Sequence, residues 1–443
     1  MAASVFASAL YGGLFPTGEV GRLWSDAAEV RAMLLVEGAL ARAQGSLGVI
    51  PEISGAFIHR AAMEVQIDPA GLAGATGRNG VAVPALVAAF RKAMEAPEHA
   101  NYVHWGATSQ DIIDTGLMLR LRQTLAALEA RLSDVLQALG AAAARHAETP
   151  MAARTYGQVA TPTSFGAVLA QWGAPLADAA DELPDLRTRA LWISLSGAAG
   201  TSAALGPQAG ALRAAMAEAL GLGDPGRSWH TDRGPILRIA GWMAQVMAAL
   251  AAMGTSLVAL AASEVGEVRL TGAGASSTMP QKANPVGPSV LVALGHQMSG
   301  LMASLQAAAS HQHQRDGAAW FAEWMVLPQI ALSGAAALET ANAVLEGLEP
   351  VPGRMLDNLG GAGLIHAEAL SFALAAHMPR AEAQAATKAL VAEAAQTGAA
   401  LEAVARAAHP DLPPTVFDPA AQTGDAPQAA RAFAARAARV AQA

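Results

Sequence analysis

The residues with the clearest chemical potential lie in a polar stretch from Gly272 to Pro285, within an otherwise alanine-rich sequence. Ser276 and Ser277 follow a run of small residues, and Lys282 and Asn284 come shortly after them. Because Lys282 and Asn284 are two residues apart, an extended backbone would point both side chains in the same direction. The chain has only three lysines, and Met-Pro and Asn-Pro pairs restrict the backbone around this one. The pattern favours a functional loop over a flexible surface loop.

An earlier polar stretch, from His104 to Thr115, leads into a long predicted helix. Thr108 and Ser109 would therefore lie at or near the N-terminus of that helix. Backbone N–H groups at such a terminus bind carboxylate or phosphate oxygens. From this stretch alone, an ordinary helix cap is the simpler interpretation.

A further polar stretch lies between two predicted helices, from Arg154 to Thr163. It combines a cation, several hydroxyls and an amide, among them Arg154, Tyr156 and Gln158. A binding loop and a polar surface loop with an exposed arginine explain this composition equally well.

Long helices must position these stretches, because good helix formers such as alanine and leucine dominate the sequence. We expect one helix from about Asp26 to Gln44, with Asp26 and Glu29 at capping-box spacing and Gly45 beyond its end. A longer helix is expected from about Asp111 to Glu148. Its large residues follow an unbroken three–four alternation, typical of a coiled-coil-like seam: Met118, Leu121, Leu125, Leu128, Leu132, Val135 and Leu139. No segment shows strand alternation bounded by hairpin turns, so the sequence predicts an all-α protein.

The segment from Ile239 to Ser263 has no charged residue and is long enough to span a bilayer. Its large residues fall on one helical stripe, with mostly small residues elsewhere: Ile239, Trp242, Met243, Val246, Met247, Leu250, Met253, Leu257 and Leu260. A helix that faces lipid would be apolar all round. We therefore favour a buried helix over a membrane span.

Composition restricts the class of protein. The 443 residues carry a net charge of −8, with 53% hydrophobic and only 14% charged residues. This excludes a disordered polyelectrolyte, and the lack of a basic block argues against a nucleic-acid partner. The absence of cysteine excludes disulfides, thiolate metal sites and a cysteine nucleophile. The first cationic side chain is Arg22, so we expect no signal peptide and a cytoplasmic protein. Proline-marked boundaries predict three domains, 1–104, 105–348 and 349–443.

The three polar stretches resemble, in the same order, the three separated motifs of the fumarase/aspartase superfamily. The last is very similar to the family's Gly-Ser-Ser-x-Met-Pro-x-Lys-x-Asn loop, and the first to its Gly-Ala-Thr-Ser-x-Asp motif. The resemblance implies three helical domains with a central long-helix bundle. It also implies a homotetramer whose active sites are shared between subunits. Ser276 would then be the acid or base at the substrate's α-carbon, Lys282 and Asn284 would hold the aci-carboxylate, and three residues would bind carboxylates: Thr108, Ser109 and Gln158.

Tyr156 indicates which reaction of the superfamily to expect. Related lyases that cleave adenylosuccinate or argininosuccinate carry a histidine in this or a related motif, which protonates a nitrogen leaving group. A carboxylate, with a pKa near ~4, leaves without a general acid. Tyr156 therefore favours the lactone-forming branch, a cofactor-free isomerisation of a small tricarboxylate. The alternatives are a lyase of adenylosuccinate or a related succinyl adduct and, from another class, a non-catalytic helical assembly protein.

A cluster of His311, His313 and Arg315 lies further downstream. On a helix, His311 and Arg315 would share one face and His313 would point elsewhere. The histidine spacing comes with no carboxylate ligand pattern, so we predict no metal site. A cationic face for the substrate carboxylates is the better interpretation, since the arginine fork matches a carboxylate. Further substrate-binding candidates are Arg154, Tyr156 and His104, with helix packing as the alternative for His104; for His366 we favour packing.

Overall fold

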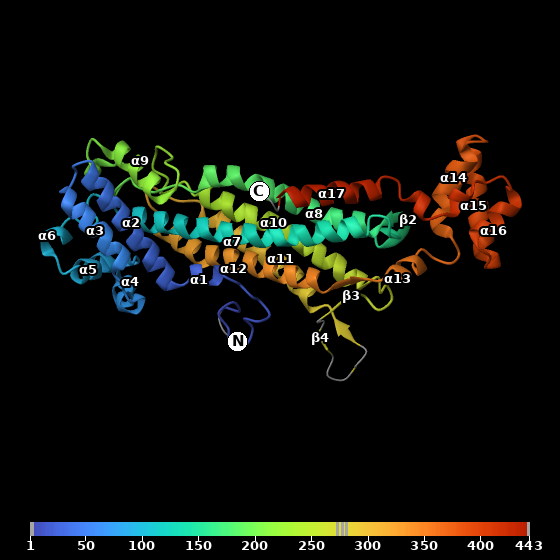
Figure 1. Cartoon of the computed structure of the whole chain (residues 1–443), viewed down its shortest axis with the longest axis horizontal. Helices are drawn as coiled ribbons and strands as arrows, with labels where there is room; N and C mark the ends of the chain where they lie inside the picture. The colour runs from blue at the N-terminus through green and yellow to red at the C-terminus, as the bar shows by residue number, and fades with distance from the viewer. Residues whose placement is uncertain (1–3, 272–273, 276–278, 280–281, 441–443) are drawn as a thin grey trace. The chain divides into compact units, whose positions relative to one another are not determined.

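The computed structural model describes residues 4–271, 274–275, 279 and 282–440, most of which lie in α-helices (Figure 1). The predicted all-α class is confirmed. The chain divides into two compact units, each assembled from segments far apart in the sequence. Unit 1 comprises Met1–Ala130, Asp181–Met247 and Leu294–Glu339, and unit 2 comprises Arg131–Ala180, Ala248–Ala293 and Thr340–Ala443. The division into three domains at residues 104 and 348 stays a prediction.

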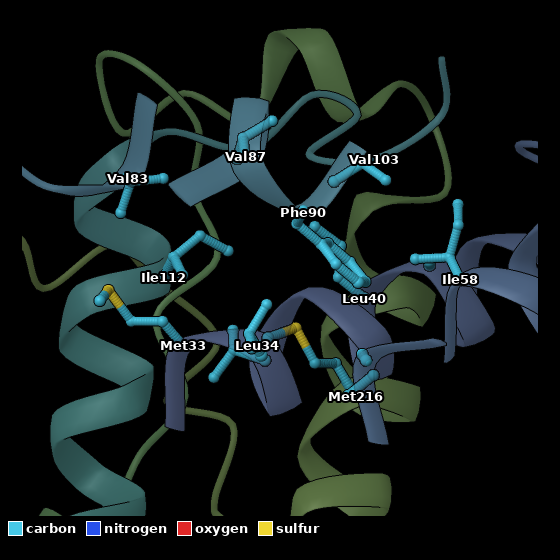
Figure 2. Packing of buried hydrophobic residues seen from close by; sticks show 14 of the residues in the cluster. Met33, Leu34, Leu40, Ile58, Val83, Val87, Phe90, Val103, Ile112 and Met216 are labelled. Carbon is cyan, nitrogen blue, oxygen red and sulfur yellow. The ribbon is translucent and has the colours of Figure 1, made fainter. Parts of the chain in front are cut away.

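Unit 1 contains a group of shorter helices: α1 (Val20–Leu23), α2 (Asp26–Ser46), α3 (Glu52–Glu64), α4 (Ala73–Asn79), α5 (Val83–Ala93), α6 (Pro97–Ala100) and α9 (Ala209–Leu220). The apolar faces of α2, α3, α5 and α9, together with Ala100 of α6, form one core, shown in Figure 2. Large side chains from α2, α3, α5 and α9 are at most 1% exposed there: Met33, Leu34, Leu40, Ile58, Phe90 and Met216. This core supports the chain that leads into the first polar stretch, because Val103 and Ile112 also belong to it.

The first predicted helix is α2, which continues two residues beyond the expected end. Its N-cap is Ser25, whose hydroxyl accepts the Ala28 N–H at 3.3 Å, so the predicted capping box at Asp26 is wrong. Gly45, expected after the helix, lies inside it. A Cβ at Gly45 would come within 3.3 Å of the Gly55 Cα in α3. The glycine therefore permits a close approach of the two helices.

Among the described segments, five long helices contribute residues to both units: α7 (Ser109–Arg145), α8 (Phe165–Ala190), α10 (Gly234–Leu260), α11 (Val286–Ala308) and α12 (Gly317–Glu346). The predicted long helix corresponds to α7. All seven residues of its predicted seam are at most 2% exposed. The seam is therefore a buried face in both units.

The uncharged segment from Ile239 to Ser263 lies largely in α10, which ends at Leu260. By length and composition, α10 and α12 are the described helices that could cross a membrane. About half of the most apolar segment of each helix is buried, 44% in α10 and 56% in α12. The nine large residues of the α10 stripe are all at most 7% exposed. The interpretation as a buried core helix is confirmed.

Unit 2 contains short strands that the sequence did not predict. β1 (Pro150–Thr155) and β2 (Gln158–Ser164) form a hairpin, β3 (Val268–Leu270) pairs with β6 (Leu348–Pro350), and β4 (Gly274–Ala275) pairs with β5 (Ala283–Asn284). The β1–β2 turn is Tyr156-Gly157, with positive φ at both residues, 51° and 74°. That backbone suits a two-residue hairpin, but Tyr-Gly lacks the asparagine or aspartate that normally signals one.

The C-terminal part of unit 2 is again helical, with α13 (Pro352–Asp357), α14 (Ala367–Ala375), α15 (Arg380–Thr397), α16 (Leu401–Ala408) and α17 (Ala426–Val440). α14, α15 and α16 gather in one group (Figure 1) and share a small core that includes Leu374 and Leu401. His366 is 6% exposed and its Nδ1 lies 3.0 Å from Gln422 Oε1. The packing role expected for His366 agrees with this position.

Candidate active site

His104 lies in the turn before α7 and contacts a buried carboxylate. Its Nδ1 is 2.7 Å from Oε1 of Glu37, and the Glu37 side chain is only 1% exposed. Burial alone would lower the pKa of His104, but the hydrogen bond and the charge of Glu37 outweigh it, so the pKa is raised. This pairing favours the packing alternative for His104.

The first turn of α7 is anchored by Asp111, which is fully buried. Its carboxylate accepts backbone N–H groups from Thr108, Ser196 and Gly197 at 2.9–3.0 Å. His230 Nε2 lies 2.8 Å from Asp111 Oδ1. A single carboxylate thus holds the N-terminus of α7 against a loop more than eighty residues away in the sequence.

Arg315 lies directly over this turn. Its Nε donates to Gln110 Oε1 at 2.8 Å, and its Nη2 donates to Thr108 Oγ1 at 3.3 Å and to the Ala198 carbonyl at 3.1 Å. The residue itself is exposed. The structure therefore brings together two candidates from separate polar stretches, Thr108 and Arg315. Ser109 is the first residue of α7 and is half-buried.

A buried ionic cluster lies beneath Gln110. Arg233 donates to both oxygens of Asp114 at 2.8 and 3.1 Å and to both oxygens of Glu323 at 2.6 and 2.8 Å. All three side chains are at most 1% exposed. Burial alone would lower the pKa of Arg233, but the two carboxylates raise it well above its ordinary value. The guanidinium is charged at any physiological pH.

His311 lies in the same unit, and its pKa is lowered by burial and by the charge of Arg233. It is therefore neutral at pH 7. His311 and Arg315 do not share a helix face, since α12 begins only at Gly317. Asp316 caps that helix by accepting the N–H groups of Ala318 and Ala319 at 3.0 and 3.1 Å.

Arg154, in unit 2, is committed to a carboxylate. Its guanidinium makes two hydrogen bonds to Glu267, at 2.7 and 2.9 Å, and the Glu267 side chain is fully buried. Asn358 donates to the same carboxylate at 2.8 Å. This arrangement gives Arg154 a structural role, and we drop it as a substrate-binding candidate.

The remaining candidates in unit 2 lie in exposed hairpins. Tyr156 is fully exposed at the β1–β2 turn, and Gln158 is exposed at the start of β2. Lys282 is exposed and precedes β5, where half-buried Asn284 pairs with Gly274. The extended backbone expected here is present at Asn284. Ser276 lies outside the described residues.

Sequence reasoning missed five residues of this arrangement: Asp111, Asp114, His230, Arg233 and Glu323. A signal was available for two of them, because Asp111 and Asp114 lie three residues apart on either side of Ile112 and Ile113. Buried charges without partners are costly, so their presence there implied partners. Among the described residues, no group of three or more His, Asp or Glu side chains could hold a metal ion.

The chain was compared with known proteins. The model of a lyase family matches residues 17–300. The chain belongs to the fumarate lyase superfamily. A 3-carboxy-cis,cis-muconate cycloisomerase of Pseudomonas aeruginosa is 41% identical over 84% of this chain and 83% of that protein. A nitrosuccinate lyase of Streptomyces davaonensis is 37% identical over 87% and 84%. The crystal structure of a 3-carboxy-cis,cis-muconate lactonizing enzyme from Pseudomonas putida matches 98% of this chain and 100% of its own, with 34% identity and a TM-score of 0.90.

Within this lyase fold, the unit 1 cluster suits the recognition of an anion. A guanidinium, a hydroxyl and the N-terminus of a long helix lie together, and each favours a carboxylate oxygen. These groups are therefore the candidate carboxylate contacts of unit 1.

Proposed function

We propose that this enzyme is a 3-carboxy-cis,cis-muconate cycloisomerase acting in the breakdown of protocatechuate. The observation that carries the proposal is the nearly full-length similarity to a cycloisomerase and a lactonizing enzyme of Pseudomonas. The candidate carboxylate contacts around Arg315 support it, because the substrate is a tricarboxylate.

In the proposed reaction, one carboxylate oxygen of the substrate adds to the conjugated double bond and forms the lactone C–O bond. The electron pair moves into the neighbouring carboxylate, giving an aci-carboxylate. Lys282 and Asn284 stabilise that charge, and Ser276 delivers a proton to the α-carbon. Solvent later returns a proton to Ser276. Thr108, Ser109 and Arg315 place the other carboxylates, with Gln158 and His311 as further contacts. The reaction needs no redox cofactor, since no electrons leave the substrate.

Tyr156 supports a reaction without an amine leaving group, because an amine needs a general acid to leave. It therefore counts against adenylosuccinate and related succinyl adducts. Tyr156 does not count against the elimination of nitrite, which also leaves as a stable anion. The similarity to a nitrosuccinate lyase over 87% of the chain makes this elimination the second candidate.

The test is a direct comparison of three substrates with the purified full-length protein. We expect 3-carboxy-cis,cis-muconate to lose its diene absorbance in the ultraviolet, whereas adenylosuccinate stays intact. Nitrite release from nitrosuccinate is measured in parallel. An unchanged diene spectrum together with rapid nitrite release would assign the protein to the second candidate. No turnover of any of the three would favour the non-catalytic assembly protein.

Two variants test the assigned roles. Ser276→Ala should lower kcat by at least ~100-fold, because general acid catalysis contributes roughly 10²–10⁴-fold. Undiminished turnover would remove Ser276 as the proton donor. Tyr156→His should gain cleavage of a succinyl adduct if this position selects the leaving group, and no gain would contradict that use of Tyr156.

We also propose a cytoplasmic homotetramer whose active sites combine motifs from different subunits. Light scattering gives the mass of the assembly. Ser276→Ala and Arg315→Gln subunits, each with reduced activity, should regain part of the wild-type activity when they are unfolded together and refolded. Each variant refolded alone is the control, and no recovery in the mixture would contradict shared sites.

A further inference from the structure

Gln110 connects the exposed Arg315 to the buried ionic cluster of unit 1. It is fully buried, and each of its amide atoms has a partner. Nε2 donates to Asp114 Oδ2 at 3.1 Å and to the His230 carbonyl at 2.9 Å. Because both of these partners are acceptors, the amide has only one favourable orientation. Its Oε1 must therefore face Arg315.

The support beneath Gln110 is rigid as well as buried. Asp114 is held by two hydrogen bonds from Arg233, which is itself held by Glu323. The chain of contacts leads from Glu323 through Arg233 and Asp114 to Gln110, and ends at the Nε of Arg315. Within the described residues, this chain fixes the inner edge of the Arg315 guanidinium.

The partners of Arg315 differ from those of Arg154 and Arg233. Arg154 and Arg233 each pair with a carboxylate, which compensates their charge. Within the described part of the chain, the hydrogen bonds of Arg315 go to three neutral oxygens, of Gln110, Thr108 and Ala198. Arg315 is thus held in place while its positive charge stays available.

We propose that Gln110 is a positioning residue that presents the charged Arg315 to a substrate carboxylate. A glutamate would compensate the charge of the guanidinium and would place its second oxygen against the Asp114 carboxylate and the His230 carbonyl, whereas an apolar residue would leave the orientation of Arg315 open. This inference rests on the proposed role of Arg315. It also explains why the buried residue at position 110 carries a neutral amide.

The experiment is a double-mutant cycle between Gln110 and Arg315. The variants Gln110→Met, Arg315→Gln and the double variant are compared with wild type. The readouts are KM and kcat for the muconate, and the Kd for tricarballylate, an unreactive tricarboxylate, by calorimetry. Gln110→Met should raise KM and Kd about tenfold, as expected for a lost hydrogen bond to a charged group, with kcat changed less than about threefold. In the Arg315→Gln background, the same change should alter neither constant by more than about twofold.

The matched control is Gln44→Met, because Gln44 is also fully buried in unit 1 and donates to the Trp105 carbonyl at 2.7 Å. Gln44→Met should lower the melting temperature as Gln110→Met does. Its effect on the Kd for tricarballylate, however, should be the same in the wild-type and Arg315→Gln backgrounds. If Gln110→Met does not fold, Gln110→Leu replaces it, with the same expected rise in Kd. Gln110→Glu has the same size and should raise Kd more than tenfold by compensating Arg315.

The outcomes separate the two proposals. Equal effects of Gln110→Met in both backgrounds would overturn the positioning role alone. A Kd unchanged by Gln110→Glu would do the same. If Arg315→Gln leaves both KM and Kd within twofold of wild type, Arg315 is not a substrate contact, and the positioning role is overturned with it. Loss of muconate turnover with retained, Arg315-dependent tricarballylate binding would instead contradict only the cycloisomerase assignment.

Discussion

Replacing Arg233 with methionine removes a guanidinium that pairs with two buried carboxylates in unit 1. Arg233 makes two hydrogen bonds to Asp114 and two to Glu323, at 2.6–3.1 Å. Methionine fills much of the space of the arginine stem, so the change creates little cavity. It leaves the charges of Asp114 and Glu323 without a partner.

The magnitude follows from these contacts. Breaking a buried ion pair by removing one partner costs about 3–5 kcal/mol of unfolding free energy. Arg233 serves two carboxylates and also lies 4.9 Å from the centre of the Trp229 ring, so we expect the upper end of that range. About 5 kcal/mol corresponds to a fall in Tm of roughly 10–20 °C for a unit of this size. Replacing Asp114 and Glu323 by Asn and Gln as well should recover most of the loss, because no buried charge then stays unpaired.

Thermal unfolding followed by circular dichroism measures the effect. The matched control is Arg227→Met, since Arg227 pairs with Asp232 at the surface, where the two side chains are 51% and 43% exposed. A surface pair contributes about 0–1 kcal/mol, so the control should lower Tm by less than ~4 °C. The reasoning fails if Arg233→Met melts within a few degrees of the control, or if the triple variant is no more stable than Arg233→Met alone.

Three further predictions concern stability. Leu125→Ala, at a fully buried seam position, should lower the unfolding free energy by about 2–5 kcal/mol in urea titrations, whereas Leu10→Ala, 78% exposed, should change it little. His104 has a raised pKa, so the stability from its pairing with Glu37 is fully present below its ordinary pKa of 6.5 and is lost as pH rises through the raised value. Tm should therefore fall more steeply above pH 6.5 in wild type than in Glu37→Gln, and equal slopes would contradict the pairing. Gly55→Ala would place a Cβ 2.5 Å from a carbonyl oxygen of α2 and should lower Tm, and an unchanged Tm would show that α2 and α3 pack less closely.

The long helices could be predicted because their buried faces repeat with helical period over many turns. In α7 and α10 the large residues of the predicted stripes are buried. The need to bury one helix face produces both the period in the sequence and the burial in the structure. The β1–β2 hairpin could not be predicted in this way. Its strands are short, and its turn depends on positive φ at Tyr156, which the sequence does not signal.

The hydrogen-bonding partners of the site residues could not be predicted, since they lie far apart in the sequence. Arg154 and Arg315 both stand in polar stretches and look alike as candidates. Arg154 meets Glu267, 113 residues away, and Arg315 meets Gln110, 205 residues away. The first partner is charged and the second is neutral. For these two arginines, the charge of the partner, which only the fold determines, decides whether the charge of the guanidinium is compensated.

This distinction gains weight from the scarcity of charge in the chain, where only 14% of residues are charged. An anionic substrate competes for each cation with the carboxylates of the protein itself. Arg154 and Arg233 are paired with buried carboxylates, and these ion pairs stabilise the two units. The hydrogen bonds of Arg315 go to neutral oxygens, so its described hydrogen-bond partners do not compensate its charge. A protein with an acidic net charge can bind an anionic ligand if the charge of one well-placed cation is left uncompensated. The local field at Arg315, rather than the net charge of −8, then determines the affinity.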